Sequence, residues 1–193
     1  PQLIHACSAE SSPDVALGAC LSIVEAIGRR SAYFSLLNEN PAALKRLVTL
    51  AARSDFLSRQ VATHPLLLDE LLDPRVFSKE PRRIDLEDDL ALRLTDQSSD
   101  DPELSLENIR NFQQAAVFRV AVADMSGVLP LMKVSGRLTD IAELVVEAAL
   151  QLAYGEMVAR HGRPMCDDGD GLREAYFGAL GYGKLGGLEL GYG

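Results

Sequence analysis

The glycines of this chain are concentrated at its C-terminal end, and their distribution limits the fold more than any other feature. Seven of the 15 glycines lie between Gly178 and Gly193. Glycine is unfavourable inside a helix because ordering it costs more conformational entropy than ordering alanine. The segment 177–193 is therefore expected to be turn-rich, whereas the sequence before it can form helices.

A phosphate-binding loop is predicted within this segment. Four apolar residues form a short predicted buried strand: Tyr176, Phe177, Ala179 and Leu180. The loop that follows contains Gly181, Gly183, Lys184, Gly186 and Gly187. A strand that leads through bare backbone into a helix leaves N–H groups unpaired at the positive end of the helix dipole, where a phosphate binds well. Lys184 would add a full positive charge beside them.

Three known motifs can be compared with this loop. A Walker A lysine must be followed by Ser or Thr, and Leu185 stands there instead, so this motif is excluded. Gly181, Gly183 and Gly186 match the dinucleotide fingerprint G-x-G-x-x-G, which also requires an acidic residue roughly 20 positions further on. In the third motif, that of the DNA polymerase beta superfamily, a hydrophobic residue followed by Gly-Gly or Gly-Ser binds a triphosphate. The second and third motifs both remain open at this point.

The stretch Gly181–Tyr192 resembles the signature of the glutamine synthetase adenylyltransferases, Gly-Lys-Leu-Gly-Gly-x-Glu-Leu followed within a few residues by Ser-Asp-x-Asp-Leu. The resemblance extends from about Leu21 to the end of the chain. Three further segments resemble those that precede the second, adenylylating domain of this family: Arg30–Leu37, His64–Pro74 and Met132–Ser135. The Ser-Asp-x-Asp segment is not in the sequence, so we expect a fragment that lacks the metal-binding carboxylates.

The resemblance implies an ATP-dependent enzyme that attaches AMP to a tyrosine of glutamine synthetase, removes it in the family, and so regulates nitrogen assimilation. ATP and Mg²⁺ are the implied cofactors. Glutamine synthetase and a PII-type signalling protein are the implied partners. The implied triphosphate ligands are Gly183, Lys184, Gly186 and Gly187. No catalytic or metal-binding residue is expected within the chain, so the fragment should be inactive alone. The alternatives are a helical protein-interaction module and a truncated Rossmann enzyme.

Composition excludes several other classes. A net charge of -9 argues against a nucleic-acid partner, since phosphates are neutralised by clustered Lys and Arg. No apolar run approaches the roughly 20 residues that span a bilayer, so no membrane association is expected. Cys7, Cys20 and Cys166 have unrelated spacings that favour a reducing cytoplasm and no structural zinc.

Residues 1–74 predict an array of short helices separated by Pro-containing joints. Helices are expected over 13–27 and 31–37. Three more should start near Asn40-Pro41, Ser54 and Thr63-His64-Pro65. His64 immediately precedes a proline at a helix start, which favours a structural role over a catalytic one.

Residues 75–101 form a polar connecting region with one short helix over 84–94. Its buried side should contain Ile84, Leu86, Leu90 and Leu94. An acidic cluster accompanies this helix: Asp85, Glu87, Asp88, Asp89, Asp96, Asp100 and Asp101. A solvated helix face explains this cluster better than a metal site does.

Residues 102–161 predict two long helices. The first, starting at Asp101-Pro102 and ending near Ser126-Gly127, has an apolar stripe of Leu106, Ile109, Phe112, Ala116, Val120 and Ala123. The second should run from about Ser135 to Arg160, with Leu138, Ile141, Val145, Ala148 and Leu152 as its stripe. A short link between them favours antiparallel packing. Arg119 is either a surface residue or a group that reaches the nucleotide.

A mobile loop is expected over 164–171, with Asp167, Asp168 and Asp170 too poorly spaced for calcium. Residues 175–193 are the truncated start of a nucleotidyltransferase domain. The predicted fold is therefore mainly α: a helical array and a long antiparallel helix pair that lead into the first strand and Gly-rich loop of a polymerase-beta-type nucleotidyltransferase α/β domain.

Overall fold

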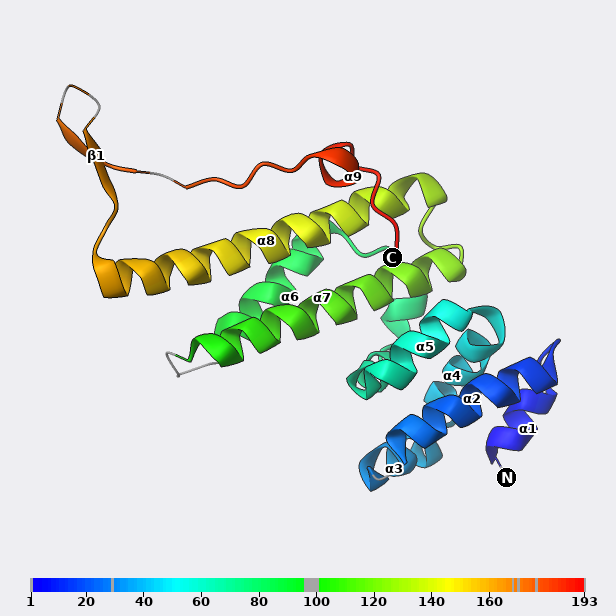
Figure 1. Ribbon diagram of the computed structural model, residues 1–193. Helices are drawn as coiled ribbons and strands as arrows, with labels where there is room; N and C mark the ends of the chain where they lie inside the picture. The colour runs from blue at the N-terminus through cyan, green and yellow to red at the C-terminus, as the bar shows by residue number, and fades with distance from the viewer. Residues whose placement is uncertain are drawn as a thin grey trace. The chain divides into compact units, whose positions relative to one another are not determined.

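The computed structural model describes residues 2–28, 30–95, 101–167, 169, 171–175 and 177–192. The chain is mainly helical and has a small two-stranded antiparallel sheet (Figure 1). This confirms the predicted mainly α class. The chain forms two compact units: Pro1–Pro81 together with Gln114–Val134, and Arg82–Gln113 together with Ser135–Gly193.

The first unit begins with the predicted array of short helices. They are α1 (Gln2–Ser8), α2 (Pro13–Ile27), α3 (Ser31–Glu39), α4 (Pro41–Arg53), α5 (Asp55–Thr63) and the 3₁₀ helices η1 (Pro65–Leu71) and η2 (Pro74–Phe77). Prolines occupy the first turns of α2 and α4, where their missing N–H costs nothing. The Ser54 side chain caps α5 by accepting a hydrogen bond from the Leu57 N–H. These local signals explain why the predicted helix starts are confirmed.

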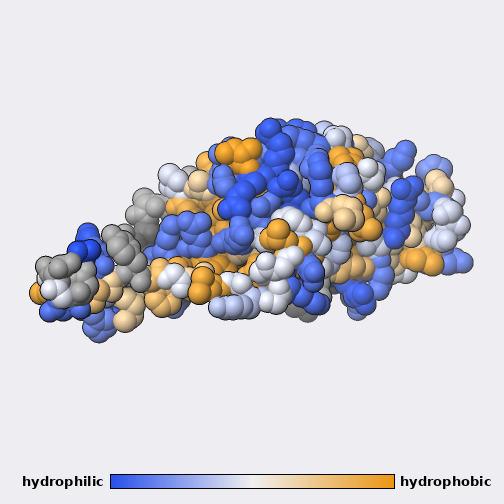
Figure 2. Space-filling view, turned by 90° about the horizontal axis from the view of Figure 1, so that it is seen from above, coloured by the Kyte–Doolittle hydropathy of each residue, from blue (hydrophilic) through white to orange (hydrophobic). Residues whose placement is uncertain are grey.

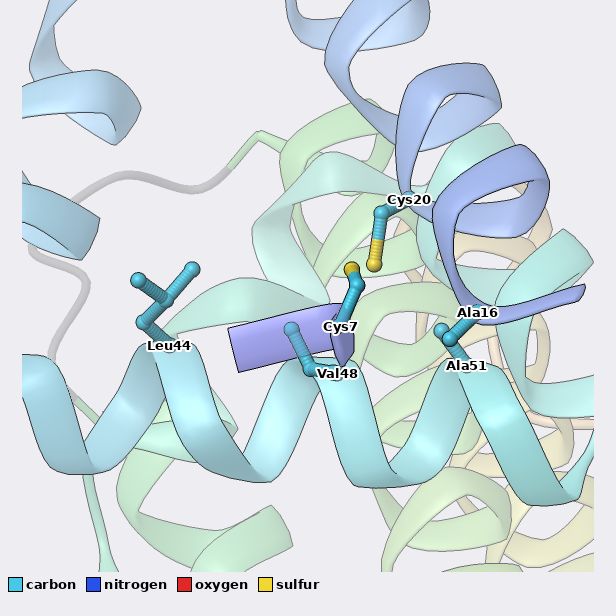
Figure 3. Close-up of a cluster of buried hydrophobic side chains, with 6 residues drawn as sticks. All are labelled: Cys7, Ala16, Cys20, Leu44, Val48 and Ala51. Atoms are coloured by element: carbon cyan, nitrogen blue, oxygen red, sulfur yellow. The ribbon is translucent and has the colours of Figure 1, made fainter. Parts of the chain in front are cut away.

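The core of this unit lies where α1, α2 and α4 meet. One buried cluster consists of Cys7, Ala16, Cys20, Leu44, Val48 and Ala51 (Figure 3). The predicted apolar face of α4 is confirmed, since Leu47 and Val48 are each only 1% exposed. The packing therefore follows the helical period of the sequence.

The helix predicted to start near Pro65 is a 3₁₀ helix. Its C-terminal carbonyls are held by Arg46 on α4, whose guanidinium donates to the carbonyl oxygens of Leu71 at 2.6 Å and Leu72 at 3.3 Å. The same guanidinium lies 5.6 Å from the centre of the Phe77 ring. His64 ends α5 and its carbonyl accepts the Leu67 N–H, while the structural role of its side chain stays a prediction.

In the second unit, α6 (Arg83–Thr95) corresponds to the predicted short helix. Leu86 and Leu90 are buried, but Ile84 is 50% exposed, so the prediction that Ile84 faces the core is wrong. Leu86 stands two positions after Ile84, which at 3.6 residues per turn places the two side chains on nearly opposite sides of the helix. Leu94 is half-buried.

The acidic residues of α6 form ion pairs on its surface. Asp85 pairs with Arg82 at 2.9 Å, and Asp89 pairs with Arg93 at 2.8 Å. Asp88 is exposed. Within the described part of the chain no group of three His, Cys, Asp or Glu could hold a metal ion. Two acidic residues of the predicted cluster, Asp96 and Asp100, lie outside the described residues.

The two predicted long helices are α7 (Pro102–Met125) and α8 (Leu131–His161). Asp101 caps α7, because its carboxylate accepts the Glu103 N–H at 2.9 Å. The predicted stripe of α7 is buried from Ile109 onward, but Leu106 is 48% exposed, so its assignment to the core is wrong. Leu106 lies in the second turn of α7, before the buried part of the stripe begins at Ile109.

Helix α8 starts four residues earlier than predicted, at Leu131. Met132 in this first turn is 92% exposed, whereas Val134, four positions before Leu138, is buried, so the apolar stripe of α8 begins one turn earlier than predicted. Farther along α8, Leu138 and Ile141 are buried as predicted, whereas Val145, Ala148 and Leu152 are half-buried. The antiparallel packing of α7 and α8 stays a prediction.

Helix α7 ends in a Schellman motif at Gly127. The Val128 N–H donates to the Ala123 carbonyl at 2.9 Å, and the Gly127 N–H donates to the Asp124 carbonyl at 2.9 Å. Gly127 has a φ of 70°, which is the left-handed conformation that this motif requires. The predicted helix end near Ser126-Gly127 is therefore confirmed.

The segment 164–171, predicted as a mobile loop, contains strand β1 and the turn of a hairpin, and its mobility stays a prediction. Strand β1 (Met165–Asp167) pairs antiparallel with β2 (Leu172–Glu174), with Met165 opposite Glu174. The Glu174 carboxylate accepts hydrogen bonds from Tyr154 on α8 at 2.9 Å and from Arg163 at 2.7 Å. These side-chain bonds attach the hairpin to the end of α8. The predicted loop residues Asp168 and Asp170 lie outside the described residues.

The buried strand predicted over 176–180 is not found in its described part. Phe177 is 70% exposed and Leu180 is 81% exposed, and residues 177–182 have no strand partner among the described residues. A strand is stable only when neighbouring strands satisfy its backbone. The apolar sequence therefore indicated a strand in a sheet that these residues do not build. Tyr176 lies outside the described residues.

Hydrophobic side chains on the face shown in Figure 2 are interspersed with hydrophilic ones. Across the described residues, every helix is too short or too polar to span a membrane.

Candidate functional site

The glycine-rich segment folds into one compact turn around α9 (Gly183–Gly186). The Gly187 N–H donates to the Gly183 carbonyl at 2.8 Å, and the Glu189 N–H donates to the Lys184 carbonyl at 2.7 Å. The four residues predicted to bind triphosphate, Gly183, Lys184, Gly186 and Gly187, are therefore brought together in one helical turn and its end.

Close backbone approach makes glycine necessary at position 186. A Cβ placed on Gly186 would lie 2.5 Å from the Gly181 carbonyl oxygen, well inside van der Waals contact. Leu185 packs on the other side of Gly181, since a Cβ there would be 3.1 Å from the Leu185 side chain. The turn is thus closed by contacts between its two arms, and any side chain at 186 would open it.

The turn ends in a second Schellman motif, in which leucine replaces the usual glycine. The Glu189 N–H reaches back to Lys184, and the Leu188 N–H donates to the Leu185 carbonyl at 3.2 Å. Leu188 has a φ of 57°, the only positive φ found for a non-glycine residue in the described part of the chain. A left-handed leucine costs on the order of 1 kcal/mol or more, so the turn holds Leu188 against its own preference.

Lys184 is exposed, and within the described residues it has no ion-pair partner. Its ammonium group is therefore accessible to an anion. The N–H groups of Gly186 and Gly187 are already used inside the turn, donating to the carbonyls of Tyr182 at 3.5 Å and Gly183 at 2.8 Å. Among the four predicted ligands, Lys184 therefore offers an ammonium group that takes no part in the hydrogen bonds of the turn.

A cleft of about 690 Å³ separates the turn from α8. The turn contributes Leu180, Gly181, Leu185, Gly186 and Leu188 to its lining, and α8 contributes Glu143, Val146, Glu147 and Leu150. The carboxylate of Glu147 makes this side of the turn unfavourable for a polyanion, whereas Glu143 is paired with Arg83. Lys184 is outside the lining, so the cationic group and the acidic wall belong to different faces of the turn.

Arg83 on α6 lines the same cleft and is the centre of an ion-pair network. Its guanidinium contacts Glu143 at 2.6 Å, Glu87 at 2.9 Å and Asp140 at 3.1 Å. These carboxylates, Glu143 first, raise the pKa of Arg83 above its ordinary value. Asp140 is also bonded to Arg137. The network joins α6 to α8 and keeps Arg83 neutralised.

Sequence reasoning did not identify Arg83. Two of its partners are 57 and 60 residues away in the chain, and only the Arg83–Glu87 spacing of four residues is visible as a pattern.

Arg119, predicted either to be a surface residue or to reach the nucleotide, lies in the first unit. It is mostly buried and is 3.8 Å from the Glu70 carboxylate. Arg110 is exposed.

Comparisons with known proteins agree with the sequence of the turn. Residues 44–193 match the family described as Glutamate-ammonia ligase adenylyltransferase. A protein of Pseudomonas putida, named bifunctional glutamine synthetase adenylyltransferase/adenylyl-removing enzyme, is 47% identical over the whole chain. Proteins of the same name from Thioalkalivibrio sulfidiphilus and Pseudomonas aeruginosa are 46% and 44% identical over the whole chain.

These relatives are adenylyltransferases, the class of enzyme whose signature sequence the lysine-bearing turn resembles. The chain belongs to the glutamate-ammonia ligase adenylyltransferase family. It covers 20% of the length of each of these three relatives.

Proposed function

We propose that the chain is part of an ATP-dependent adenylyltransferase that attaches AMP to a tyrosine of glutamine synthetase and also removes it. The observation that carries this proposal is the family match across residues 44–193, which includes the complete lysine-bearing turn. The names of the relatives describe both activities for those proteins. Such an enzyme would regulate nitrogen assimilation by switching glutamine synthetase off and on.

Within this function, Lys184 neutralises the triphosphate of ATP. Its exposed ammonium group can approach a phosphate without first breaking an ion pair seen in the described residues. Gly183, Gly186 and Gly187 complete the binding loop. Their role in this conformation is to keep the turn compact and free of side chains, because Gly186 tolerates no Cβ beside the Gly181 carbonyl. The turn therefore fits a triphosphate at the face that carries Lys184.

The acidic wall of the cleft supports this orientation. Glu147 would repel a polyanion from the side of the turn that faces α8, whereas the charge of Glu143 is balanced by Arg83. Arg83, though cationic, already contacts three carboxylates and is not free to bind a phosphate. We therefore place the nucleotide on the outer face of the turn and assign the inner face to holding the turn against α8.

Mg²⁺ bound to ATP would neutralise charge on the phosphates and activate the attacking tyrosine hydroxyl. The described residues provide no group of three potential metal ligands, so they do not fit an all-protein metal site. We expect the 193-residue chain by itself to transfer no AMP, because the Ser-Asp-x-Asp segment, whose carboxylates hold the metal ions by the family resemblance, is not in the sequence. Glutamine synthetase is the proposed protein substrate, and a PII-type signalling protein is proposed as a second partner on the family resemblance alone.

A transfer assay tests the proposed reaction. Glutamine synthetase and Mg²⁺ are incubated with the complete enzyme and ATP labelled at either the α- or the γ-phosphate. Label from the α-phosphate should appear on the synthetase, whereas label from the γ-phosphate should leave with pyrophosphate. A synthetase whose target tyrosine is replaced by phenylalanine is the control. Labelling from the γ-phosphate would identify a kinase and refute the proposal.

A further inference from the structure

Two of the three cysteines, far from the glycine-rich turn, form a pair in the core of the first unit. Cys7 on α1 is 2% exposed and Cys20 on α2 is fully buried. Figure 3 shows their sulfur atoms pointing toward one another above α4. Both side chains belong to the same buried cluster. Thirteen positions separate the two residues in the chain, so their proximity results from the packing of α1 on α2.

The surroundings of this pair exclude most other roles for two thiols. The neighbouring side chains of the cluster, Ala16, Leu44, Val48 and Ala51, are apolar and provide no ligand or base. In the described part of the chain no third metal-binding side chain joins the two sulfurs. Packing alone does not require a reactive group at both positions, because a buried free cysteine behaves as a small hydrophobic residue. The chemistry that remains is reaction of the two sulfurs with each other.

We propose that Cys7 and Cys20 form a reversible disulfide that fastens α1 to α2. The oxidant is a small-molecule disulfide such as oxidised glutathione. The Cys7 thiolate attacks one of its sulfurs and releases one molecule of thiol. The Cys20 sulfur then displaces the second, so the Sγ–Sγ bond forms while two thiol molecules carry away the two electrons and the two protons.

The fold controls access to this reaction. Burial, with a further contribution from Cys7, raises the pKa of the Cys20 thiol to about 12, so the closed core contains almost no Cys20 thiolate. Reaction therefore begins when α1 separates from α2. Helix α1 has only seven residues, and the segment after it is held by a hydrogen bond of 2.8 Å from Thr49 to the Glu10 carboxylate.

Fastening α1 also fixes one wall of a cavity. Gln2 and Leu3 of α1 form one wall of an apolar cavity of about 440 Å³, and Cys20 contributes to its lining. The cross-link keeps this wall in place. Because it also constrains the unfolded chain between residues 7 and 20, the disulfide should raise the melting temperature of the first unit by roughly 12 to 24 °C.

The test uses the chain with Cys166→Ser, which removes the exposed thiol and leaves only the buried pair. The protein is incubated with oxidised glutathione, and the cysteines are mapped by digestion and mass spectrometry before and after dithiothreitol. We expect a Cys7–Cys20 cross-linked peptide, loss of both alkylatable thiols, and the stated rise in melting temperature, all reversed by dithiothreitol. A Cys7→Ala variant in the same background should show none of these changes.

A parallel incubation in mild urea, which opens α1, should form the same cross-link faster. The proposal is overturned if both thiols stay alkylatable in either condition, or if Cys7 stops at a mixed disulfide with glutathione. It is also overturned if the cross-linked form melts at a lower temperature than the reduced form, since the bond would then strain α1 rather than fasten it. These outcomes depend only on the Cys166→Ser protein.

Discussion

Replacing Arg83 by methionine should destabilise the second unit more than loss of an ordinary surface arginine. Methionine keeps much of the apolar stem but removes three ion pairs, to Glu87, Asp140 and Glu143. A partly exposed pair contributes about 0.2 to 1 kcal/mol, and the Arg83 side chain is 41% exposed, so solvent screening limits the sum. Asp140 is the most buried partner, with a side chain that is 17% exposed, so its ion pair with Arg83 should contribute near the upper end of that range. We expect a loss of about 1 to 2 kcal/mol.

Urea unfolding followed by far-ultraviolet circular dichroism measures this loss. The matched control is Arg59→Met on α5, which removes a single pair with Asp55 whose two side chains are 72% and 78% exposed. The control should change stability by less than about 0.5 kcal/mol. High salt should reduce the Arg83 effect. Equal losses for Arg83→Met and Arg59→Met would refute the assignment of the network as the link between α6 and α8.

Three further predictions concern backbone and pH. Gly127→Ala should lower the stability by about 1 kcal/mol because it forces a side chain into the left-handed conformation, whereas Gly155→Ala inside α8 should raise it by about 0.5 to 1 kcal/mol. If thermal melts show that both variants shift the melting temperature in the same direction, this prediction is contradicted. Hydrogen bonds from Arg163 and Tyr154 lower the pKa of Glu174 below its ordinary 4.5. The hairpin is therefore stabilised by the ionised Glu174 above pH 4.5 and loses this stabilisation as the pH falls through the lowered pKa. Amide chemical shifts of β2 that do not change in that range would argue against this prediction. Amides of residues 177–181 should exchange much faster than those of α7, and equal protection would mean that they pair with other backbone.

The sequence was sufficient for elements whose limits are set by neighbouring residues. Pro13, Ser54, Asp101 and Gly127 each satisfy or release backbone groups at a helix end, so their effect does not depend on the rest of the fold. The helix predicted over 13–27 has those same limits in the structure. The glycine spacing also predicted a turn at 181–187 that brings four candidate ligands together.

The sequence was insufficient where burial depends on distant partners. Ile84, Leu106 and Phe177 are apolar and were assigned to a core or strand, but no described element covers them. The pairing of Arg83 with Asp140 has no local signal, and neither does the contact of Cys7 with Cys20. Each of these results from the packing of separate helices, which a linear pattern does not specify.

The sequence-based interpretation of the site changed in one chemical respect. The motif assigned backbone donors at Gly186 and Gly187, but in the structure these N–H groups are engaged inside the turn. Both are the i→i−4 hydrogen bonds of the helical turn itself, since Gly186 donates to Tyr182 and Gly187 donates to Gly183. Lys184 is left as the principal group for an anion.

The assignment of Lys184 to the triphosphate is the central claim, and steady-state kinetics of Lys184→Ala in the complete enzyme tests it most directly. A charged hydrogen bond to phosphate contributes about 1.5 to 3 kcal/mol, which corresponds to about a tenfold to hundredfold fall in kcat/KM for ATP. Because Lys184 is exposed, the variant should lose less than about 0.5 kcal/mol of stability. Lys45→Ala, which removes an exposed lysine from α4, should change neither quantity. An unchanged kcat/KM for ATP in Lys184→Ala, with an unchanged melt, would contradict the assignment.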